Sequence, residues 1–136
     1  VNLNSVFNVT SSVINKMREN GFGRIINISS VNGQKGQFGQ TNYAATKSAL
    51  IGFSKSLALE SASKGITSNV ICPGYINTEM VAAIREDILK SIIDTIPSKR
   101  LGEAKEIAEM VSYLVSENAS YINGATFSVN GGLWMD

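Results

Sequence analysis

Apolar residues recur every three or four positions along several stretches of the chain, which is the spacing of an amphipathic helix. This pattern predicts helices over residues 3–20, 42–63, 86–96 and 103–116, and Gly21 supplies a left-handed stop after the first. Each helix would bury one stripe of side chains against a neighbouring layer. In the last three helices we expect the core-facing residues to be Ala49, Leu50, Phe53, Leu57, Ala58, Ala62, Ile88, Leu89, Ile92, Ile93, Ile96, Ile107, Met110, Val111 and Leu114.

Three short apolar runs bounded by turn residues predict β-strands. They cover residues 23–29, 66–72 and 125–129, and the Pro73-Gly74 pair cuts off the second sharply. Because strands alternate with helices, the order predicts an α/β fold, with a parallel sheet, right-handed crossovers and helices on both faces. Loops are expected at 31–40, which is rich in glycine, at 75–85, which has weak helical character, and at 98–102.

The composition is typical of a single folded domain. The 136 residues are 43% hydrophobic, enough to bury a core, and the net charge of +1 argues against a nucleic-acid partner. No apolar run approaches the length of a membrane span, and the N-terminus does not have the pattern of a signal peptide. The single cysteine, Cys72, cannot form an intrachain disulfide, so a reducing, cytoplasmic compartment is expected. Because Val1 starts abruptly in a helical pattern, we interpret residues 1–136 as a fragment that begins within a domain.

The chain contains no histidine, which narrows its chemistry more than any other feature of the composition. A Ser-His-Asp triad and His-based metal sites are therefore excluded, and we expect no metal. A proton donor or acceptor at neutral pH must come from Asp, Glu, Lys, Tyr or Cys instead.

One serine, one tyrosine and one lysine form the candidate reactive group. Tyr43 and Lys47 are four positions apart on the predicted helix 42–63, so they lie on one face of it. Ser30 follows the first predicted strand, at the edge where parallel strands deliver residues to a crevice. An ammonium stabilises a neighbouring phenolate, so this tyrosine could deliver a proton to a carbonyl oxygen held by the serine, with a hydride coming from elsewhere. On spacing alone, a chance pairing of tyrosine and lysine is the alternative.

Four segments of the sequence together resemble the short-chain dehydrogenase/reductase family. They are Asn-Ile-Ser-Ser-Val-Asn-Gly (27–33), Tyr-Ala-Ala-Thr-Lys (43–47), Asn-Val-Ile-Cys-Pro-Gly-Tyr-Ile-Asn-Thr (69–78) and Gly-Ala-Thr-Phe-Ser-Val-Asn-Gly-Gly (124–132). The match runs through the whole chain, in order and with the family's spacing. It implies the C-terminal half of a doubly wound, Rossmann-type parallel sheet, without the family's N-terminal half and its Gly-rich pyrophosphate turn.

The resemblance implies a role for each matching residue. Tyr43 is similar to the family's catalytic acid/base, and Lys47 is similar to the partner that activates the tyrosine and binds the nicotinamide ribose. Ser30, rather than Ser29, is similar to the serine that holds the substrate oxygen, because the family's serine precedes an apolar residue. Asn2 is similar to the asparagine that anchors a proton-relay water. The residues implied for cofactor binding, with NADP expected and NAD as the alternative, are Tyr43, Lys47, Pro73, Gly74, Tyr75, Ile76 and Thr78.

Two branches of the family look close to this chain. One is the acetoacetyl-CoA reductases, which supply 3-hydroxybutyryl-CoA for polyhydroxybutyrate, and the other is the 3-oxoacyl-(acyl-carrier-protein) reductases of fatty-acid synthesis. The run 33–43 resembles the first, so the expected function is NADPH-dependent reduction of acetoacetyl-CoA, an acyl-CoA thioester. The amides of Gln37 and Gln40 can pair with a thioester or a pantetheine amide, and Phe38 with Tyr75 suits a short acyl group. The residues implied for substrate binding are Ser30, Gln37, Phe38, Gly39, Gln40, Tyr75 and Arg85.

Two alternatives stay open for the function. The chain could act on carrier-protein thioesters, or it could be a non-catalytic fragment or interaction module, because half of the cofactor site is absent from it. For Arg85, which by resemblance contacts coenzyme A, an exposed and solvated side chain is an equal alternative. The resemblance also implies a homo-oligomer, a dimer or tetramer, in which helices 3–20 and 42–63 form a bundle.

Overall fold

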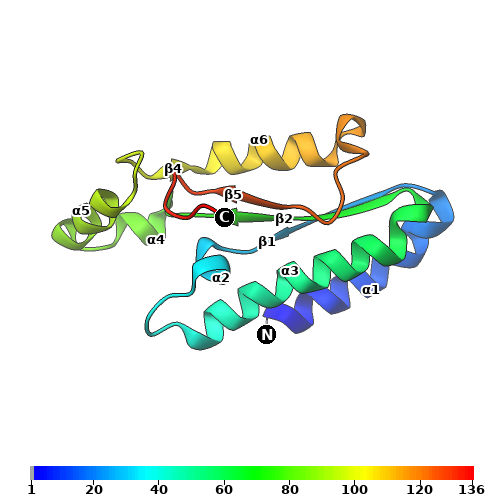
Figure 1. Ribbon diagram of the computed structural model, residues 1–136, viewed down its shortest axis with the longest axis horizontal. Helices are drawn as coiled ribbons and strands as arrows, with labels where there is room; N and C mark the ends of the chain where they lie inside the picture. The colour runs from blue at the N-terminus through cyan, green and yellow to red at the C-terminus, as the bar shows by residue number, and fades with distance from the viewer. Residues whose placement is uncertain (1) are drawn as a thin grey trace.

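A three-stranded parallel sheet forms the centre of the protein, in a computed structural model that describes residues 2–136 (Figure 1). Its strands are β1 (Gly23–Ile28), β2 (Ile66–Pro73) and β5 (Thr126–Val129), in the order β1-β2-β5. The middle strand, β2, is buried along residues 66–72: β1 pairs with one edge, β5 pairs with the second half of the other edge from Val70 on, and helices cover both faces. The three predicted strands are therefore confirmed, with ends that differ by one residue.

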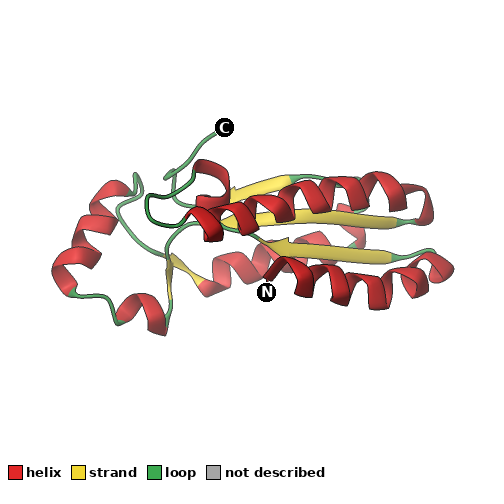
Figure 2. Ribbon diagram, turned by 90° about the horizontal axis from the view of Figure 1, so that it is seen from below, coloured by secondary structure: helices red, strands yellow, loops and turns green. Residues whose placement is uncertain are grey.

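Helices cover both faces of the sheet. α1 (Asn2–Asn20) and α3 (Thr41–Ser61) lie side by side on one face, and α6 (Ala104–Val115) covers the other (Figures 1 and 2). On the first face Ile14, Leu57 and Ile66 form a buried cluster. On the second face the buried cluster consists of Ile71, Leu114 and Ala119, with Ile107, Met110 and Val111 of α6 packed against it. The predicted α/β class, with a parallel sheet between helical layers, is confirmed.

Several short elements lie where loops were expected. The glycine-rich stretch contains α2 (Val31–Lys35), and the stretch after β2 contains β3 (Ile76–Asn77) and α4 (Glu79–Ala82). β3 pairs in parallel with β4 (Gly102–Glu103), which precedes α6. Helices of four or five residues and strands of two are too short to show a hydrophobic period, so the pattern could not predict them. The remaining elements are two turns of 3₁₀-helix, η1 (Ala62–Lys64) and η2 (Glu117–Ala119).

Two expectations about burial are wrong. Ala62 is exposed, because α3 ends at Ser61 and the chain turns through η1 to Gly65 in a left-handed conformation. The helix expected over 86–96 is α5 (Glu86–Thr95), and it contains no buried residue, although Ile96 directly after it is only 2% exposed. α4 and α5 lie beyond the end of the sheet, so the sheet offers the apolar stripe of α5 no partner layer (Figure 1).

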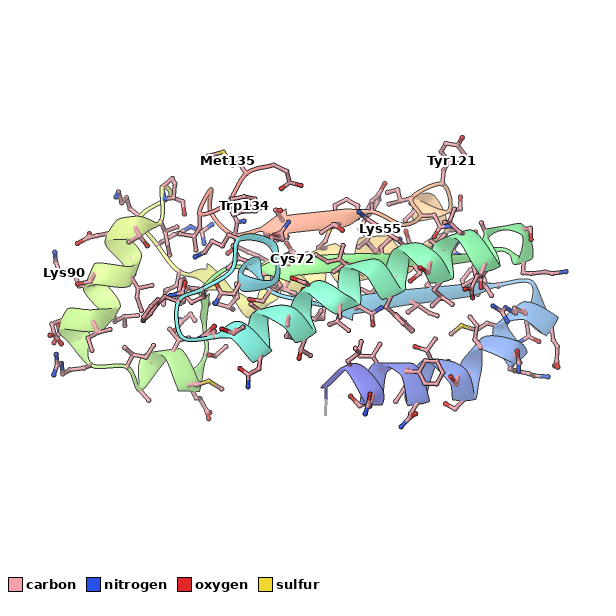
Figure 3. All side chains as sticks on the ribbon, turned by 60° about the horizontal axis from the view of Figure 1, so that its bottom comes forward. Lys55, Cys72, Lys90, Tyr121, Trp134 and Met135 are labelled. Atoms are coloured by element: carbon pink, nitrogen blue, oxygen red, sulfur yellow. The ribbon has the colours of Figure 1, made fainter. Side chains whose placement is uncertain are left out.

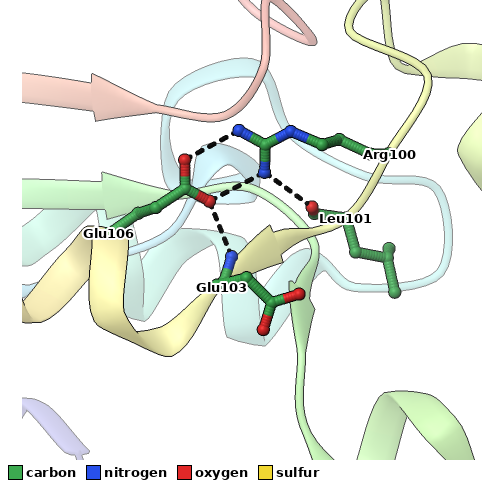
Figure 4. A network of polar contacts seen from close by, with 4 residues as sticks. All are labelled: Arg100, Leu101, Glu103 and Glu106. Carbon is green, nitrogen blue, oxygen red and sulfur yellow. Dashed lines mark hydrogen bonds and ion pairs between the residues drawn. The ribbon is translucent and has the colours of Figure 1, made fainter.

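A polar network fixes the start of α6 (Figure 4). The Arg100 guanidinium pairs with the Glu106 carboxylate at 2.7 Å, and the same carboxylate accepts a hydrogen bond from the Glu103 backbone N–H at 2.8 Å. The hydrogen bond from Arg100 lowers the pKa of Glu106 to about 2.

Within residues 2–136, no helix combines the length and the apolar character that a membrane span requires.

Candidate functional site

A cavity of about 610 Å³ opens at the carboxyl ends of β1 and β2. Its walls come from three places: the residues directly after β1, the first turn of α3, and the chain that leaves β2 and continues into α4. The carboxyl edge of a parallel sheet is where α/β proteins bind ligands. The sequence-predicted residues that line this cavity are Ser30, Gln40, Tyr43, Gly74, Tyr75, Ile76 and Thr78.

Ser30 and Ser29 have different surroundings although they are neighbours. Ser30 caps α2, and its hydroxyl oxygen accepts a hydrogen bond from the Asn32 backbone N–H at 3.1 Å. Because the hydroxyl acts as an acceptor there, its proton stays available for a ligand in the cavity. The Ser29 side chain is buried instead, and its hydroxyl donates to the Lys47 carbonyl at 2.7 Å.

Tyr43 and Lys47 lie next to each other at the start of α3. The Lys47 Nζ atom is 5.8 Å from the centroid of the Tyr43 ring, and it donates a hydrogen bond to the Ile28 carbonyl at 2.9 Å. The Tyr43 side chain is 40% exposed and borders the cavity. The helix therefore holds the ammonium beside the tyrosine ring, at the end of the strand that precedes Ser30, although Lys47 itself does not line the cavity.

The loop between α2 and α3 contributes one expected residue to the cavity. Gln40 lines it, and its side-chain oxygen accepts a hydrogen bond from the Asn32 amide at 3.0 Å. Phe38, expected to form an aromatic wall, is instead fully exposed, and Gln37 and Gly39 also lie outside the cavity. The backbone φ values of Gly36 and Gly39 are 74° and 77°, in the region that favours glycine. These turns lead the loop away from the sheet (Figure 1).

The chain that leaves β2 forms the opposite wall. Gly74 passes so close to Asn130 that a Cβ atom would lie 2.9 Å from the Asn130 Cα, so this position requires glycine. Thr78 caps α4 by accepting a hydrogen bond from the Val81 N–H at 3.4 Å. Pro73 is the last residue of β2 and does not line the cavity.

Three other side chains singled out in the sequence lie apart from this cavity or outside the described structure. Arg85 is exposed and pairs with Asp87 at 2.6 Å, and this pairing lowers the pKa of the Asp87 carboxyl. The Cys72 thiol is fully buried at the end of β2, and burial raises its pKa, so the thiol stays protonated (Figure 3). Asn2 is the first residue of α1, and its side chain lies outside the described part of the structure.

Five cavity-lining residues were not predicted from the sequence: Val31, Asn32, Met80, Val81 and Ile84. Val31 and Asn32 directly follow Ser30 within the motif 27–33, and this was the only signal for them. Met80, Val81 and Ile84 belong to the stretch 75–85, where the helical character was too weak to assign a face. They give the cavity an apolar side that suits an acyl group or a flat aromatic ring.

The donor set fits part of a nicotinamide dinucleotide. The hydroxyls of Ser30 and Thr78 and the Lys47 ammonium can pair with ribose hydroxyls and a carboxamide, and the open cavity has room for a flat ring. A Gly-rich turn of the kind that cradles a pyrophosphate does not occur in the sequence. The residues present therefore fit the nicotinamide side of such a cofactor.

Comparison with protein families gives a match over residues 1–134 to the model described as Enoyl-(Acyl carrier protein) reductase. The chain belongs to the short-chain dehydrogenase/reductase family. The resemblance found in the sequence is thereby confirmed, and the parallel sheet with its two helical layers is consistent with a Rossmann-type part of such a protein.

Curated relatives of this short-chain dehydrogenase/reductase chain have several names. Nodulation protein G of Azospirillum brasilense is 62% identical over 132 residues, which are 97% of this chain and 54% of that protein. Acetoacetyl-CoA reductase of Cupriavidus necator is 58% identical over 134 residues, which are 98% of this chain and 54% of that protein. The 3-oxoacyl-(acyl-carrier-protein) reductase of Salmonella typhimurium is 52% identical over 134 residues, or 98% of this chain and 55% of that protein. The chain thus spans about half the length of the curated relatives that it matches.

Proposed function

We propose that residues 1–136 are the C-terminal part of a reductase domain that reduces acetoacetyl-CoA to 3-hydroxybutyryl-CoA with NADPH, and so supplies the precursor of polyhydroxybutyrate. The supporting observation is the convergence of Ser30 and Tyr43 on one cavity, with the Lys47 ammonium beside the tyrosine ring. The name of the Cupriavidus necator relative agrees with this substrate. NADPH is preferred to NADH by resemblance.

In the proposed mechanism, three side chains handle the carbonyl oxygen of the substrate. The Ser30 hydroxyl donates a hydrogen bond to that oxygen, and the Tyr43 phenol transfers its proton to it. The Lys47 ammonium, 5.8 Å from the ring centroid, stabilises the phenolate that remains. A bound NADPH supplies the hydride. Asn2 is proposed to anchor the water that returns a proton to this group.

The remaining cavity residues are assigned to the ligands. Gly74, Ile76 and Thr78, together with the end of β2 at Pro73, are proposed to close over the nicotinamide carboxamide, and Lys47 is proposed to bind its ribose. Gln40 and Tyr75 are proposed to meet the acyl group inside the cavity.

We place Gln37, Phe38 and Gly39 next to the pantetheine arm, outside the cavity, because their exposed loop would meet the thioester as it enters. Arg85 is proposed to contact a coenzyme A phosphate. To do so, its guanidinium would have to leave the Asp87 carboxylate and pair with the phosphate instead.

The assembly is proposed to be a cytoplasmic homodimer or homotetramer. A second cavity, of about 410 Å³, lies between α1 and α3, with Phe7, Phe53 and Leu57 among its lining residues. Phe7 is 59% exposed, and Leu59 on α3 is 86% exposed. Large exposed apolar side chains on two adjacent helices support a contact with the same helices of a second copy.

The proposal is tested with a full-length chimera that joins the N-terminal half of the Cupriavidus necator enzyme to this chain. Initial rates of NADPH oxidation are compared on acetoacetyl-CoA and on the acetoacetyl thioester of an acyl carrier protein. The expected result is a kcat/KM that is higher on the CoA thioester. A preference of orders of magnitude for the carrier-protein thioester would instead assign the fatty-acid reaction, which the name of the Salmonella typhimurium relative suggests. A folded chimera that binds NADPH and reduces neither would favour the non-catalytic alternative.

A further inference from the structure

Ser29 lies at the junction of the three elements that build the reaction site. It directly follows β1, and its backbone N–H donates to the Ile71 carbonyl of β2 at 2.8 Å. Its side chain is 4% exposed, and its hydroxyl donates to the Lys47 carbonyl of α3 at 2.7 Å. One residue thus ties the ends of two strands to the helix that bears the tyrosine and the lysine.

The hydrogen bond from Ser29 is additional to the bonds of the helix. Lys47 lies inside α3, where its carbonyl accepts from the N–H four residues further on. A carbonyl oxygen has two lone pairs, so the Ser29 hydroxyl takes a second position on it. The helix would still form without the serine, and the serine therefore contributes to where the first turns of α3 are held and how firmly.

A second set of contacts holds the same point of α3 from the side of α2. Gly33 packs so tightly there that a Cβ atom on it would lie 2.9 Å from the Lys47 carbonyl carbon and 2.9 Å from the Ser29 hydroxyl oxygen. The Ser48 hydroxyl, next along the helix, donates to the Gly33 carbonyl. The backbone of Lys47 is thus fixed by contacts with the end of β1 and with α2.

The Lys47 side chain depends on this placement. Its ammonium reaches back to the Ile28 carbonyl at 2.9 Å, one residue before Ser29, and stands beside the Tyr43 ring. The two ends of Lys47 are therefore bonded to consecutive residues of the chain, the backbone carbonyl to Ser29 and the ammonium to Ile28. A shift of α3 along the sheet would lengthen both bonds together.

We propose that Ser29 is a positioning residue, which acts through the Lys47 carbonyl to hold the lysine and the tyrosine close to Ser30. This assignment rests on the proposed function for its catalytic consequence. Ser29 itself does not touch the substrate, because its side chain is buried and its proton is committed to Lys47.

The test uses Ser29→Ala and Ser29→Cys in the full-length chimera. The alanine removes the hydroxyl, whereas the cysteine fills the same space but donates only weakly. We expect both variants to lose about tenfold in kcat, since small misplacements of reacting groups cost that much or more, while KM for the thioester stays within about twofold. Reductant is kept in the assay so that the new thiol does not pair with the buried Cys72.

Ser12→Ala is the matched control. The Ser12 hydroxyl also donates to a helix carbonyl, that of Val9 at 2.7 Å, but on the exposed side of α1. Its loss should leave kcat within about twofold of the parent. The proposal would be overturned if Ser29→Cys kept the parent kcat while Ser29→Ala lost kcat. The volume of the side chain, rather than its hydrogen bond, would then be what matters.

Backbone hydrogen exchange gives a readout that does not depend on turnover. In Ser29→Ala and Ser29→Cys, amides of residues 43–51 should exchange faster than in the parent, while those of residues 52–61 should not. Unchanged exchange at 43–51 would contradict the positioning role of Ser29, whether or not the parent chimera reduces a thioester. A parent chimera that reduces no thioester would contradict only the proposed function. If the alanine variant does not fold, the cysteine variant, which keeps the volume, decides the question.

Discussion

The side chain of Asn69 should be among the largest single contributors to the stability of the sheet. Asn69 lies in β2 and is fully buried, and its amide group donates to the Ile122 carbonyl at 2.8 Å and accepts from the Ala125 N–H at 2.9 Å. It therefore fixes the loop that leads into β5. In Asn69→Ala, two backbone groups lose their partners, and each unpaired buried group costs about 1–3 kcal/mol. We expect the free energy of unfolding to fall by about 3 kcal/mol, a large part of the about 5–15 kcal/mol typical of a domain.

Urea unfolding of the full-length chimera, followed by circular dichroism, measures this loss. Asn8→Ala on the exposed side of α1 is the control and should change the free energy of unfolding by less than about 0.5 kcal/mol. A loss below about 1 kcal/mol in Asn69→Ala would refute the reasoning, because the two backbone groups would then have found water or other partners.

Two further predictions concern the surface network and the isolated chain. The pKa of Glu106 is lowered from 4.5 to about 2, so its pair with Arg100 stabilises the fold above pH 4.5 and loses that effect as the pH falls towards 2. The difference in melting temperature between the parent and Glu106→Gln should therefore shrink as the pH falls from 4.5 towards 2. A difference that is independent of pH would contradict this prediction. Glu109→Gln, on the weaker pair with Lys105 at 3.6 Å, serves as the control. In the described sheet β1 pairs only with β2, so the 136 residues alone should associate through the free edge of β1. They should also bind NADPH poorly. A monomeric chain in size-exclusion chromatography, or tight NADPH binding, would disprove these expectations.

The long elements could be predicted because periodicity reports burial directly. The stripe of Ile107, Met110, Val111 and Leu114 faces the sheet as expected, since a helix against a sheet must bury one stripe of side chains. The stripe of α5 is just as regular, yet the helix buries none of its residues. Periodicity shows that a helix is amphipathic, but it does not show which surface, in this chain or in another, covers the apolar side.

Buried polar residues were beyond the reach of the sequence pattern. Ser54 is a polar residue within α3, yet it is fully buried and accepts a hydrogen bond from the Asn27 amide at 2.7 Å. Asn69 has its partners more than fifty positions away in the sequence. Such residues can be recognised only when the fold has brought their partners together.

The candidate site was predictable to the extent that it depends on where strands end. Ser30 and Gly74 line one cavity because parallel strands deliver their following residues to one edge of the sheet, and Tyr43 joins them from the first turn of α3. The direction of Phe38 depends instead on the backbone conformations of Gly36 and Gly39, and a glycine in a sequence does not reveal which conformation it adopts. The network that ties Ser29 to Lys47 was likewise visible only in three dimensions.

The central claim is that Tyr43 is the proton donor of a carbonyl reduction, and Tyr43→Phe in the full-length chimera tests it most directly. The substitution removes only the phenol oxygen from a side chain that is 40% exposed, so the fold should survive. We predict that kcat for acetoacetyl-CoA falls by about 100-fold or more, the size of a general-acid contribution, while the melting temperature and NADPH affinity stay close to those of the parent. A folded Tyr43→Phe variant that keeps more than about a third of the parent kcat would contradict the proposed mechanism.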